Sequence, residues 1–372
     1  MRVLVLGATG KAGAAVLRVL PSLPGVERVF LADRDAEALT RTCADIHRPC
    51  ASPRYLDAES GRSLRERMSE ADLVLGCLGP FHRYEARVVE AALATGRDYI
   101  SLCDDPGATA EVTAFRAEAE RRGVRVLIGC GMTPGLSNLL ACRAASRMPG
   151  PFSLRLDWYL DMGSGLGPAT LEHLLRACGG KVDTRVDGGA GKGRAGSGEE
   201  WVEFPPPFGQ RLVGLMGHPE PCTLPASMAG AREITFRGGV GERFANLALQ
   251  TLAWVGEGGR NELGMMALRA AAWFVARRSG GSCASALRVA AEGAGGGEEM
   301  VLAVSGDYYC VSATALVAAA AWLAGKGCPA GVFTAEGALD HPGYFAHLRR
   351  LGLAVLVGER GTAEADGAPP LS

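Results

Sequence analysis

Short apolar runs alternate with segments of helical periodicity along the first 128 residues of the chain. The apolar runs predict strands at Val3–Leu6, Val29–Ala32, Asp72–Leu78, Tyr99–Leu102 and Val124–Ile128. Between them, apolar residues recur every three or four positions, which predicts helices at Lys11–Leu20, Ala36–Ile46, Glu85–Thr95 and Thr109–Arg122. Strands that alternate with helices in this way are typical of βαβ units with right-handed crossovers. We therefore expect residues 1–128 to form a doubly wound parallel sheet of the α/β class.

The pattern changes after Gly131. The stretch Gly188–Gly198 is rich in glycine and predicts a mobile surface loop. Two strand-like runs, Ala284–Ala291 and Glu299–Ser305, flank a glycine-rich turn, which is typical of a β-hairpin. Further helices are predicted at Asn246–Val255, Glu262–Ala276 and Ser312–Ala324. The second part of the chain is therefore expected to be an α+β domain with a mixed or antiparallel sheet.

Length, composition and charge exclude several classes of protein. The 372 residues are 48% hydrophobic, which excludes a single small binding module and a disordered chain. Lys and Arg number 39 and Asp and Glu number 40, so the near-zero net charge argues against nucleic acid or an anionic membrane as a partner. The longest apolar segment, Cys310–Ala324, is shorter than a bilayer span and contains Ser312 and Thr314. We therefore expect a cytoplasmic protein.

Eleven cysteines are scattered along the chain, and several lie inside apolar runs, as buried free thiols do. The sequence has no CxxC pair and neither an HxxxH nor an HExxH motif. We therefore expect no metal site.

A glycine-rich turn follows the first predicted strand and opens the first predicted helix. It consists of Gly7, Ala8, Thr9, Gly10, Lys11, Ala12 and Gly13. In a dinucleotide site, the first glycine permits a tight turn, the second lets the backbone approach the pyrophosphate, and the third allows close packing of helix on strand. The helix N-terminus adds free N–H groups and a positive dipole end. The turn is thus predicted to bind a dinucleotide, and a glycine-rich turn without a ligand is the alternative.

Positions between the predicted strands Val29–Ala32 and Asp72–Leu78 bear on the choice of cofactor. Asp33 lies twenty residues after Gly13, where a carboxylate accepts hydrogen bonds from the adenosine ribose, which favours NAD. Arg34 follows it, and its guanidinium suits a 2′-phosphate, although a solvated surface charge is an equal interpretation. Asp57 is placed to approach the adenine, or it is a plain turn residue. We expect NAD or NADP, with NAD slightly favoured.

Three segments carry a resemblance to a known family. They read GATGKAG from Gly7, GCLGPFHRYEARVVEAALATGRDYISLCDD from Gly76, and GCGMTPGLSN from Gly129. In order and spacing the chain resembles the saccharopine dehydrogenase-like family, which includes saccharopine reductase, lysine 6-dehydrogenase and carboxynorspermidine dehydrogenase. The likeness is good over roughly the first 140 residues and fainter afterwards. It implies hydride transfer between a nicotinamide and a carbon that bears nitrogen, in an amino acid or an amine built from one.

The resemblance also implies how the domains are arranged. It implies a Rossmann domain, a catalytic α+β domain that often forms a homodimer, and a last segment that returns to the first domain. We therefore place the Rossmann domain at 1–128, the catalytic domain at 129–307, the returning segment at 308–358 and a disordered tail at 359–372.

The expected nicotinamide end of the site comes from several segments. Leu78 ends the predicted strand Asp72–Leu78, and Gly79, Pro80 and Phe81 follow it, where ligands of open α/β sheets bind. The loop with Met132, Thr133, Pro134 and Gly135 is similar to the family's loop beside the nicotinamide, or it is a structural crossover. Arg237 is a candidate for binding a substrate carboxylate, because a guanidinium binds carboxylates bidentately. A solvent-facing strand arginine is its alternative role.

Chemistry at an amine carbon needs a group that exchanges the nitrogen proton near neutral pH. Asp104 and Asp105 are adjacent carboxylates whose repulsion is expected to raise one pKa, and Tyr84 is a weaker candidate. A helix N-cap before Pro106 is the alternative role of the two aspartates. The sequence thus favours an NAD(P)-dependent oxidoreductase that acts on the C–N bond of an amino acid or polyamine-like compound. A dehydrogenase of hydroxyl or aldehyde carbons and a non-catalytic dinucleotide sensor or scaffold remain alternatives.

Overall fold

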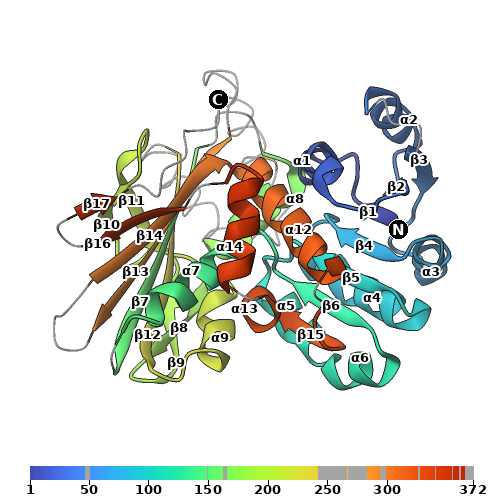
Figure 1. Cartoon of the computed structure of the whole chain (residues 1–372). Helices are drawn as coiled ribbons and strands as arrows, with labels where there is room; N and C mark the ends of the chain where they lie inside the picture. The colour runs from blue at the N-terminus through green and yellow to red at the C-terminus, as the bar shows by residue number, and fades with distance from the viewer. Residues whose placement is uncertain are drawn as a thin grey trace. The chain divides into compact units, whose positions relative to one another are not determined.

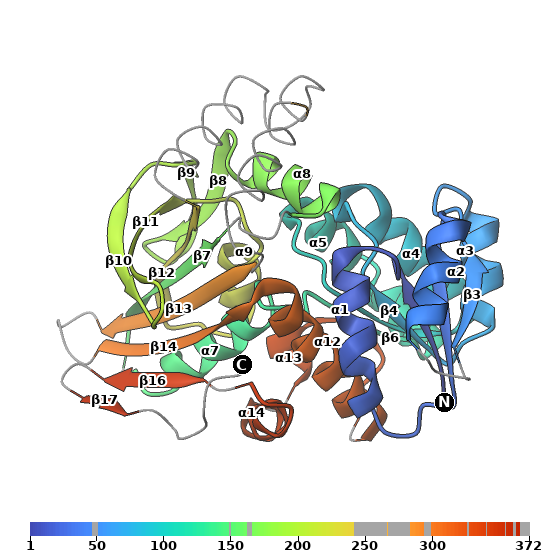
Figure 2. The ribbon, with the colours of Figure 1, turned by 90° about the horizontal axis from the view of Figure 1, so that it is seen from above.

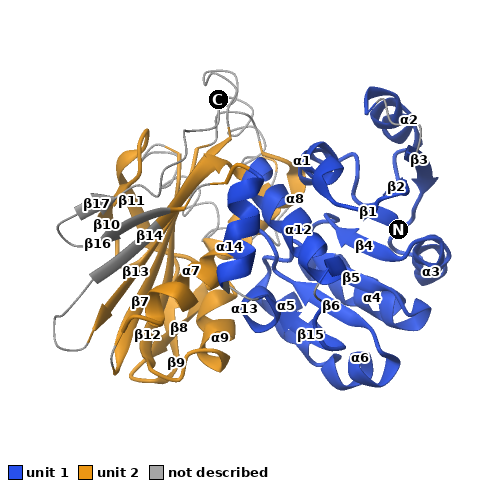
Figure 3. Ribbon diagram, in the orientation of Figure 1, with its two compact units in different colours: residues 1–135, 309–351 blue, residues 136–308, 352–372 orange. Residues whose placement is uncertain are grey.

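The computed structural model describes residues 1–372 except 47–50, 149, 162–165, 242–265, 267–282, 294–298, 326, 340, 354, 360–361 and 365–372. The chain divides into two compact units (Figures 1 and 3). Unit 1 contains residues 1–135 and 309–351, and unit 2 contains residues 136–308 and 352–372. The two predicted helices at Asn246–Val255 and Glu262–Ala276 lie outside the described residues.

Unit 1 is built on a seven-stranded sheet in which every pairing is parallel. Its strands are β1 (Arg2–Leu6), β2 (Arg28–Asp33), β3 (Ala51–Tyr55), β4 (Leu73–Gly76), β5 (Asp98–Ser101), β6 (Arg125–Ile128) and β15 (Gly331–Thr334). The order β15-β6-β5-β4-β1-β2-β3 contains the doubly wound arrangement of a Rossmann fold. The predicted α/β class is confirmed. Strand β15, which comes from the C-terminal part of the chain, extends the sheet beyond β6.

Helices cover both faces of this sheet (Figures 1 and 2). They are α1 (Lys11–Val19), α2 (Ala36–Asp45), α3 (Gly61–Ser69), α4 (Phe81–Thr95), α5 (Pro106–Thr113), α6 (Arg116–Arg122), α12 (Tyr308–Gly325), α13 (Ala335–Ala338) and α14 (His341–Arg350). Side chains of α3 to α6 join one face of the sheet in a hydrophobic cluster. The single helix predicted at Thr109–Arg122 is in fact two helices, because the chain leaves helical geometry at Phe115, whose ring packs against this cluster.

Helix α12 is long and apolar enough to cross a bilayer by length and composition. However, 67% of it is buried inside the protein. Its hydroxyl groups are used internally, since Ser312 accepts a hydrogen bond from the Met132 amide at 3.3 Å and Thr314 donates one to the Cys310 carbonyl at 2.8 Å. Burial on most sides explains why the helix is apolar all round.

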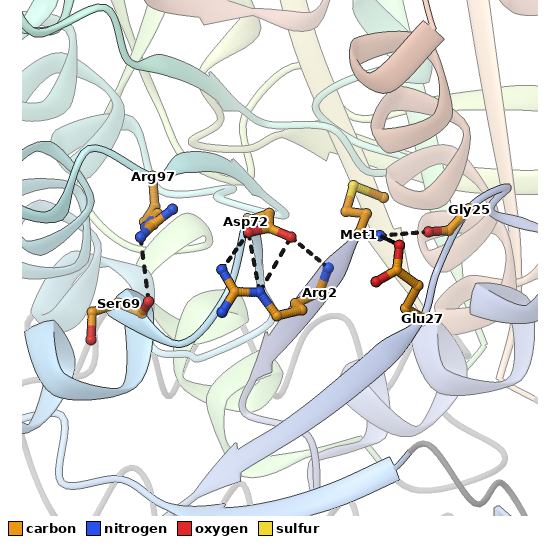
Figure 4. A network of polar contacts seen from close by, with 7 residues as sticks. All are labelled: Met1, Arg2, Gly25, Glu27, Ser69, Asp72 and Arg97. Carbon is orange, nitrogen blue, oxygen red and sulfur yellow. Dashed lines mark hydrogen bonds and ion pairs between the residues drawn. The ribbon is translucent and has the colours of Figure 1, made fainter.

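Polar contacts fix the amino ends of β1 and β4 (Figure 4). The Arg2 guanidinium donates to Asp72 through Nη2 at 2.6 Å, and the Arg2 amide donates to the same carboxylate at 2.8 Å. The N-terminal ammonium donates to the Gly25 carbonyl at 2.8 Å and pairs with Glu27 at 2.7 Å. Arg97 also donates to the Ser69 carbonyl at 3.4 Å. These contacts lie at the amino ends of the strands, away from the carboxyl ends at which open α/β sheets bind ligands.

Unit 2 is built on a ten-stranded sheet. Its strands are β7 (Phe152–Leu160), β8 (Lys181–Val186), β9 (Gly189–Arg194), β10 (Glu200–Phe204), β11 (Gly209–Leu215), β12 (Ala231–Val240), β13 (Ala284–Gly293), β14 (Glu299–Asp307), β16 (Leu356–Glu359) and β17 (Thr362–Glu364). Its helices include α7 (Leu136–Ala145), α8 (Pro168–Ala177) and α9 (Glu220–Thr223). Strands β12 and β7 pair in parallel and the other pairs are antiparallel, so the predicted mixed sheet is confirmed, as is the hairpin β13–β14.

The predicted mobile loop at Gly188–Gly198 is wrong. Residues 189–194 form strand β9, which pairs with β8 along its whole length. Asp187 and Gly188, both with positive φ, make the two-residue turn that directs β9 back along β8. The glycine-rich composition thus reflects a tight hairpin. In the tail predicted from 359 onward, residues 362–364 form strand β17, and residues 365–372 lie outside the described part of the chain.

Candidate functional site

The glycine-rich turn joins the end of β1 to the start of α1. A Cβ atom at Gly13 would lie 2.2 Å from the carbonyl oxygen of Gly7, and one at Gly7 would lie 2.7 Å from the carbonyl oxygen of Cys77. Gly7 also has a φ of +72°, which only glycine adopts readily. Gly10, in contrast, has ordinary extended geometry and is exposed. Gly7 and Gly13 are therefore required by the fold, whereas the fold itself does not require glycine at position 10.

A dinucleotide pyrophosphate fits this turn. The first turn of α1 contains no acidic residue, and no side chain caps its N-terminus. The backbone amides of Lys11, Ala12 and Gly13 belong to this first turn, where an α-helix has no internal acceptors for its N–H groups. These amides would hold the pyrophosphate. The amides of Ala8, Thr9 and Gly10 donate within the protein, to the Ala32 carbonyl, Asp33 and the Gly7 carbonyl, so these three residues would only line the turn. When bound, a nicotinamide dinucleotide supplies hydride transfer.

Asp33, at the end of β2, contacts the glycine-rich turn directly. Its Oδ2 accepts hydrogen bonds from the Thr9 hydroxyl at 2.6 Å and the Thr9 amide at 3.2 Å, and its Oδ1 accepts one from the Arg34 amide at 2.7 Å. The Arg34 side chain is exposed, and within the described part of the chain it forms no ion pair. Asp33 therefore has a structural role besides the ribose contact predicted for it.

Tyr84 lies beside the ends of β2 and β3. Its ring is 5.3 Å from the Arg83 guanidinium, and Arg83 pairs with Glu59, which follows β3. Burial raises the Tyr84 pKa, and Glu59 raises it further, while Arg83 and Arg34 act in the opposite direction. An acid or base for the nicotinamide is expected at the other strands, β5 and β6. The neighbours of Tyr84 thus do not favour a catalytic role. That role stays a prediction.

Asp57 also lies in the turn after β3. Its Oδ1 accepts a hydrogen bond from the Glu59 amide at 3.0 Å, and its own amide donates to Ser63 at 3.1 Å. These are the contacts of a turn aspartate that precedes a helix. They support the plain structural role that the sequence also allowed, and the adenine contact stays a prediction.

The segment Leu78–Phe81 joins β4 to α4 and is half-buried. It follows Cys77, whose carbonyl touches the glycine-rich turn. Strands β1 and β4 are neighbours at which the strand order reverses, and open α/β sheets bind ligands at this switch point. The structure thus brings together the two segments predicted to bind the cofactor.

Asp104 and Asp105 follow β5 and differ in their contacts. Asp105 is buried and caps helix α5, since its Oδ1 accepts a hydrogen bond from the Ala108 amide at 2.9 Å. Asp104 is half-buried and lies close enough to Glu85 to raise the pKa of that residue. The N-cap role that the sequence allowed for the pair therefore belongs to Asp105.

The sequence analysis missed Glu85, a buried carboxyl of α4. It is 1% exposed and accepts hydrogen bonds from the Tyr99 hydroxyl at 2.9 Å and the Ser101 hydroxyl at 2.5 Å. A Cβ atom at Gly76 would lie 2.1 Å from the Tyr99 hydroxyl oxygen, so glycine at the end of β4 makes room for this group. One signal was present in the sequence: Glu85 lies three and four residues before Val88 and Val89, on the apolar face of its helix.

The loop after β6 is folded tightly on itself. The Gly131 amide donates to the Pro134 carbonyl at 2.9 Å, and a Cβ atom at Gly135 would lie 2.5 Å from the Gly131 carbonyl oxygen. Met132 and Thr133 are buried, and Gly135 has a φ of +121°. The structural crossover role is therefore clear, whereas substrate contacts of this loop stay a prediction.

Arg237 lies in unit 2 on β12, opposite Asp157 of β7. Its Nε donates to Asp157 Oδ1 at 2.7 Å, and its Nη1 donates to Glu200. Asp157 is fully buried and also pairs with Arg288 at 3.2 Å. Arg237 thus does not face the solvent, and its guanidinium already pairs with two carboxylates of the protein. Binding of a substrate carboxylate by Arg237 stays a prediction.

A second buried polar group in unit 2 begins at α7. The Ser137 hydroxyl donates to Glu220 Oε1 at 2.6 Å, and Glu220 Oε2 contacts Nδ1 of His218. The His218 ring stacks on Phe236 with centroids 4.1 Å apart. This group fixes the first turn of α7 to α9. The structure describes no cluster of three or more metal-ligating side chains in the ranges given above.

Comparisons with known proteins agree with this geometry. Residues 3–127 match the family model of the saccharopine dehydrogenase NADP binding domain. An Arabidopsis thaliana protein named "probable mitochondrial saccharopine dehydrogenase-like oxidoreductase" is 29% identical over 139 residues, 34% of this chain and 31% of that protein. A trans-acting enoyl reductase of Mycobacterium ulcerans is 29% identical over 133 residues, 35% of this chain and 32% of that enzyme. The matches thus span about a third of the length of these relatives.

Solved structures extend the likeness to the whole chain. Saccharopine dehydrogenase (L-Glu forming) from Saccharomyces cerevisiae superposes with a TM-score of 0.66 at 12% identity, over 96% of this chain and 99% of that one. An amine dehydrogenase from Mycobacterium smegmatis gives a TM-score of 0.50 at 12% identity, over 91% of this chain and 96% of that one. At such identities the likeness concerns the fold. The resemblance seen in the sequence is confirmed: residues 3–127 match the saccharopine dehydrogenase NADP binding domain, and the chain is similar in fold to saccharopine dehydrogenase.

Proposed function

We propose that this protein is an NAD(P)-dependent oxidoreductase that transfers hydride at a C–N bond of an amino acid or polyamine-like compound. The glycine-rich turn supports the cofactor part of the proposal. Gly10 is exposed, whereas the backbone at Gly7 and Gly13 is closely packed against other backbone atoms. The motifs that resemble the saccharopine dehydrogenase-like family support the proposal that the reaction takes place at a C–N bond.

Asp104 is the acid or base that we propose for this reaction. Asp105 is occupied as the N-cap of α5, whereas Asp104 is half-buried at the carboxyl end of β5. Proton exchange with the substrate nitrogen needs a group within hydrogen-bond reach of it. The end of β5 is on the side of the switch point away from the adenosine-binding strands β2 and β3, where the nicotinamide half is expected.

Reduction of an activated C=C bond is a second candidate function. It rests on the trans-acting enoyl reductase of Mycobacterium ulcerans, which matches about a third of the chain with an identity equal to that of the saccharopine dehydrogenase-like relative. Such a reaction needs the same hydride site but a proton donor to carbon in place of an exchange at nitrogen.

A substrate panel separates these functions. We would incubate the purified protein with NAD or NADP and a set of amino acids, polyamines and hydroxy acids, and in the other direction with the reduced cofactors and enoyl thioesters. The absorbance of the reduced nicotinamide reports turnover. Turnover with amines is the expected result, whereas turnover only with enoyl thioesters or only with alcohols would contradict the C–N assignment. Cofactor binding without any turnover would support a sensor or scaffold.

A further inference from the structure

Glu85 has no part in the function proposed above, although it lies under the strand ends of the nicotinamide half. Tyr99 and Ser101 of β5 donate hydrogen bonds to it. Cys77 after β4, Cys103 and Asp104 after β5, and Cys130 after β6 interact with it electrostatically. These groups are neutral or acidic. Throughout the described ranges, no lysine, arginine or histidine forms an ion pair with Glu85.

The environment of Glu85 sets its charge near neutral pH. Burial disfavours the carboxylate and raises the pKa of Glu85 to about 7, and Asp104 acts in the same direction. The hydroxyl groups of Ser101 and Tyr99 act in the opposite direction, because they donate hydrogen bonds to the carboxylate. A purely apolar contact at this position would need neither the two hydroxyl donors nor the glycine at position 76. The cluster therefore holds a buried carboxyl group through two hydroxyl donors, in space that Gly76 leaves open.

We propose that Glu85 selects the oxidation state of the bound dinucleotide, because its carboxylate favours the positively charged oxidised nicotinamide over the neutral dihydronicotinamide. This inference rests on the proposed cofactor function. A charge in a dry interior acts over longer distances than one in water, so direct contact with the ring is not required. The pyrophosphate and both riboses are common to the two oxidation states, so their interaction with Glu85 cancels in the ratio of the two affinities.

Thermodynamic linkage gives a second consequence. If ionised Glu85 stabilises the oxidised cofactor, binding of that cofactor must lower the pKa of Glu85 and release protons near neutral pH. Binding of the reduced cofactor should release fewer. This release can be measured by calorimetry in buffers of different ionisation enthalpy, without any substrate or turnover.

The experiment compares dissociation constants of the oxidised and reduced dinucleotide at about pH 6 and about pH 8, on either side of the Glu85 transition. In the unaltered protein we expect the preference for the oxidised form to grow roughly three- to tenfold between the two pH values. Glu85→Gln mimics the protonated carboxyl, so it should match the unaltered protein at the lower pH and lose the increase at the higher one. If Glu85 had only a structural role, Glu85→Gln would change the ratio of the two dissociation constants equally at both pH values.

Two further variants locate the effect. Glu90→Gln removes an exposed carboxylate of the same helix and should keep the full pH dependence. Tyr99→Phe removes a hydrogen-bond donor to Glu85 and should move the transition to higher pH. A ratio that is independent of pH in the unaltered protein, or one that Glu90→Gln abolishes, would overturn the role of Glu85 while leaving the cofactor function intact. Failure to bind either dinucleotide at both pH values would overturn the cofactor function as well.

Discussion

The carboxylate of Asp33 accepts two hydrogen bonds from Thr9, one from its hydroxyl at 2.6 Å and one from its amide at 3.2 Å. This contact ties the end of β2 to the centre of the glycine-rich turn. Asp33 thus has two roles to separate, one in holding the turn and one in binding the adenosine ribose.

Asp33→Ala is expected to weaken both cofactors, and NAD more than NADP. Both affinities fall because the glycine-rich turn loses its contact with Asp33. The affinity for NAD falls further because the ribose loses its hydrogen-bond acceptor, whereas NADP also gains from the removal of a charge that repels its 2′-phosphate. Thr9→Val removes only the hydroxyl contact and should weaken NAD and NADP equally. Fluorescence titration with both dinucleotides measures this, and equal losses in Asp33→Ala would remove Asp33 from the ribose site.

Gly10→Val is expected to fold and to lose dinucleotide binding by at least about tenfold. A Cβ atom at Gly10 would meet only the Gly7 carbonyl oxygen, at 3.3 Å, so the fold accepts it with a small adjustment. The valine side chain would then occupy the approach of the pyrophosphate. Gly13→Ala is the contrasting variant, since its Cβ would lie 2.2 Å from a backbone oxygen and should destabilise the protein itself. Thermal unfolding together with binding distinguishes the two, and unchanged binding by Gly10→Val would contradict this site.

Asp104→Asn is expected to lower kcat by about a hundredfold or more while leaving cofactor affinity within a few-fold, because it removes the proposed proton-exchanging group. Asp105→Asn is the matched control. Asparagine is a good N-cap, so this variant should retain both the fold and most of the activity. The reverse pattern of rates would assign the chemistry to Asp105.

Asp72→Asn should destabilise unit 1 by about 1 kcal/mol at neutral pH, a value reduced for the partial exposure of the ion pair. The hydrogen bonds from Arg2 lower the pKa of Asp72 to about 2. A lowered carboxyl pKa stabilises the fold at pH values above the ordinary value of 3.8, and this stabilisation is lost as the pH falls toward 2. Urea unfolding should therefore show a difference between the two proteins that disappears in acid. A difference that persists at about pH 2 would show that the charge of Asp72 is not its cause.

Arg237→Leu should destabilise unit 2 by roughly 3 kcal/mol, because it leaves the buried Asp157 with Arg288 alone. Arg155→Leu is a milder control on β7, since Arg155 is more exposed and its ion pair with Glu200 is longer, at 3.9 Å. If Arg237 also binds a substrate carboxylate, KM should rise under conditions where the variant is fully folded. A rise in KM without loss of stability would favour the binding role over the structural one.

The two parts of the chain were not equally predictable. The central strands of the Rossmann sheet are short runs buried on both faces, and they alternate with amphipathic helices, so local composition is sufficient to place them. The pattern does not place the edge strand β3, which lacks a buried face and contains Pro53. In unit 2, the glycine-rich β9 looks like a loop because glycine lacks the side chains that mark a strand. Its pairing with β8 comes from the turn at Asp187 and Gly188 and from backbone hydrogen bonds, which composition does not report.

The cofactor turn could be predicted from the sequence, because the positive φ of Gly7 and the packing of Gly13 on the Gly7 carbonyl depend on backbone geometry within a few residues. The close approach of Gly7 to the Cys77 carbonyl comes from the tertiary structure. The state of the charged groups, in contrast, depends on contacts made across the fold. Glu85 acquires its partners from β5, fourteen and sixteen residues away, and Arg237 meets Asp157 across 80 residues. The charge and pKa of a buried group depend on desolvation and on neighbours that are distant in sequence. Residue type and spacing are therefore sufficient to identify candidate site residues, whereas their roles depend on burial and on contacts formed in the folded protein.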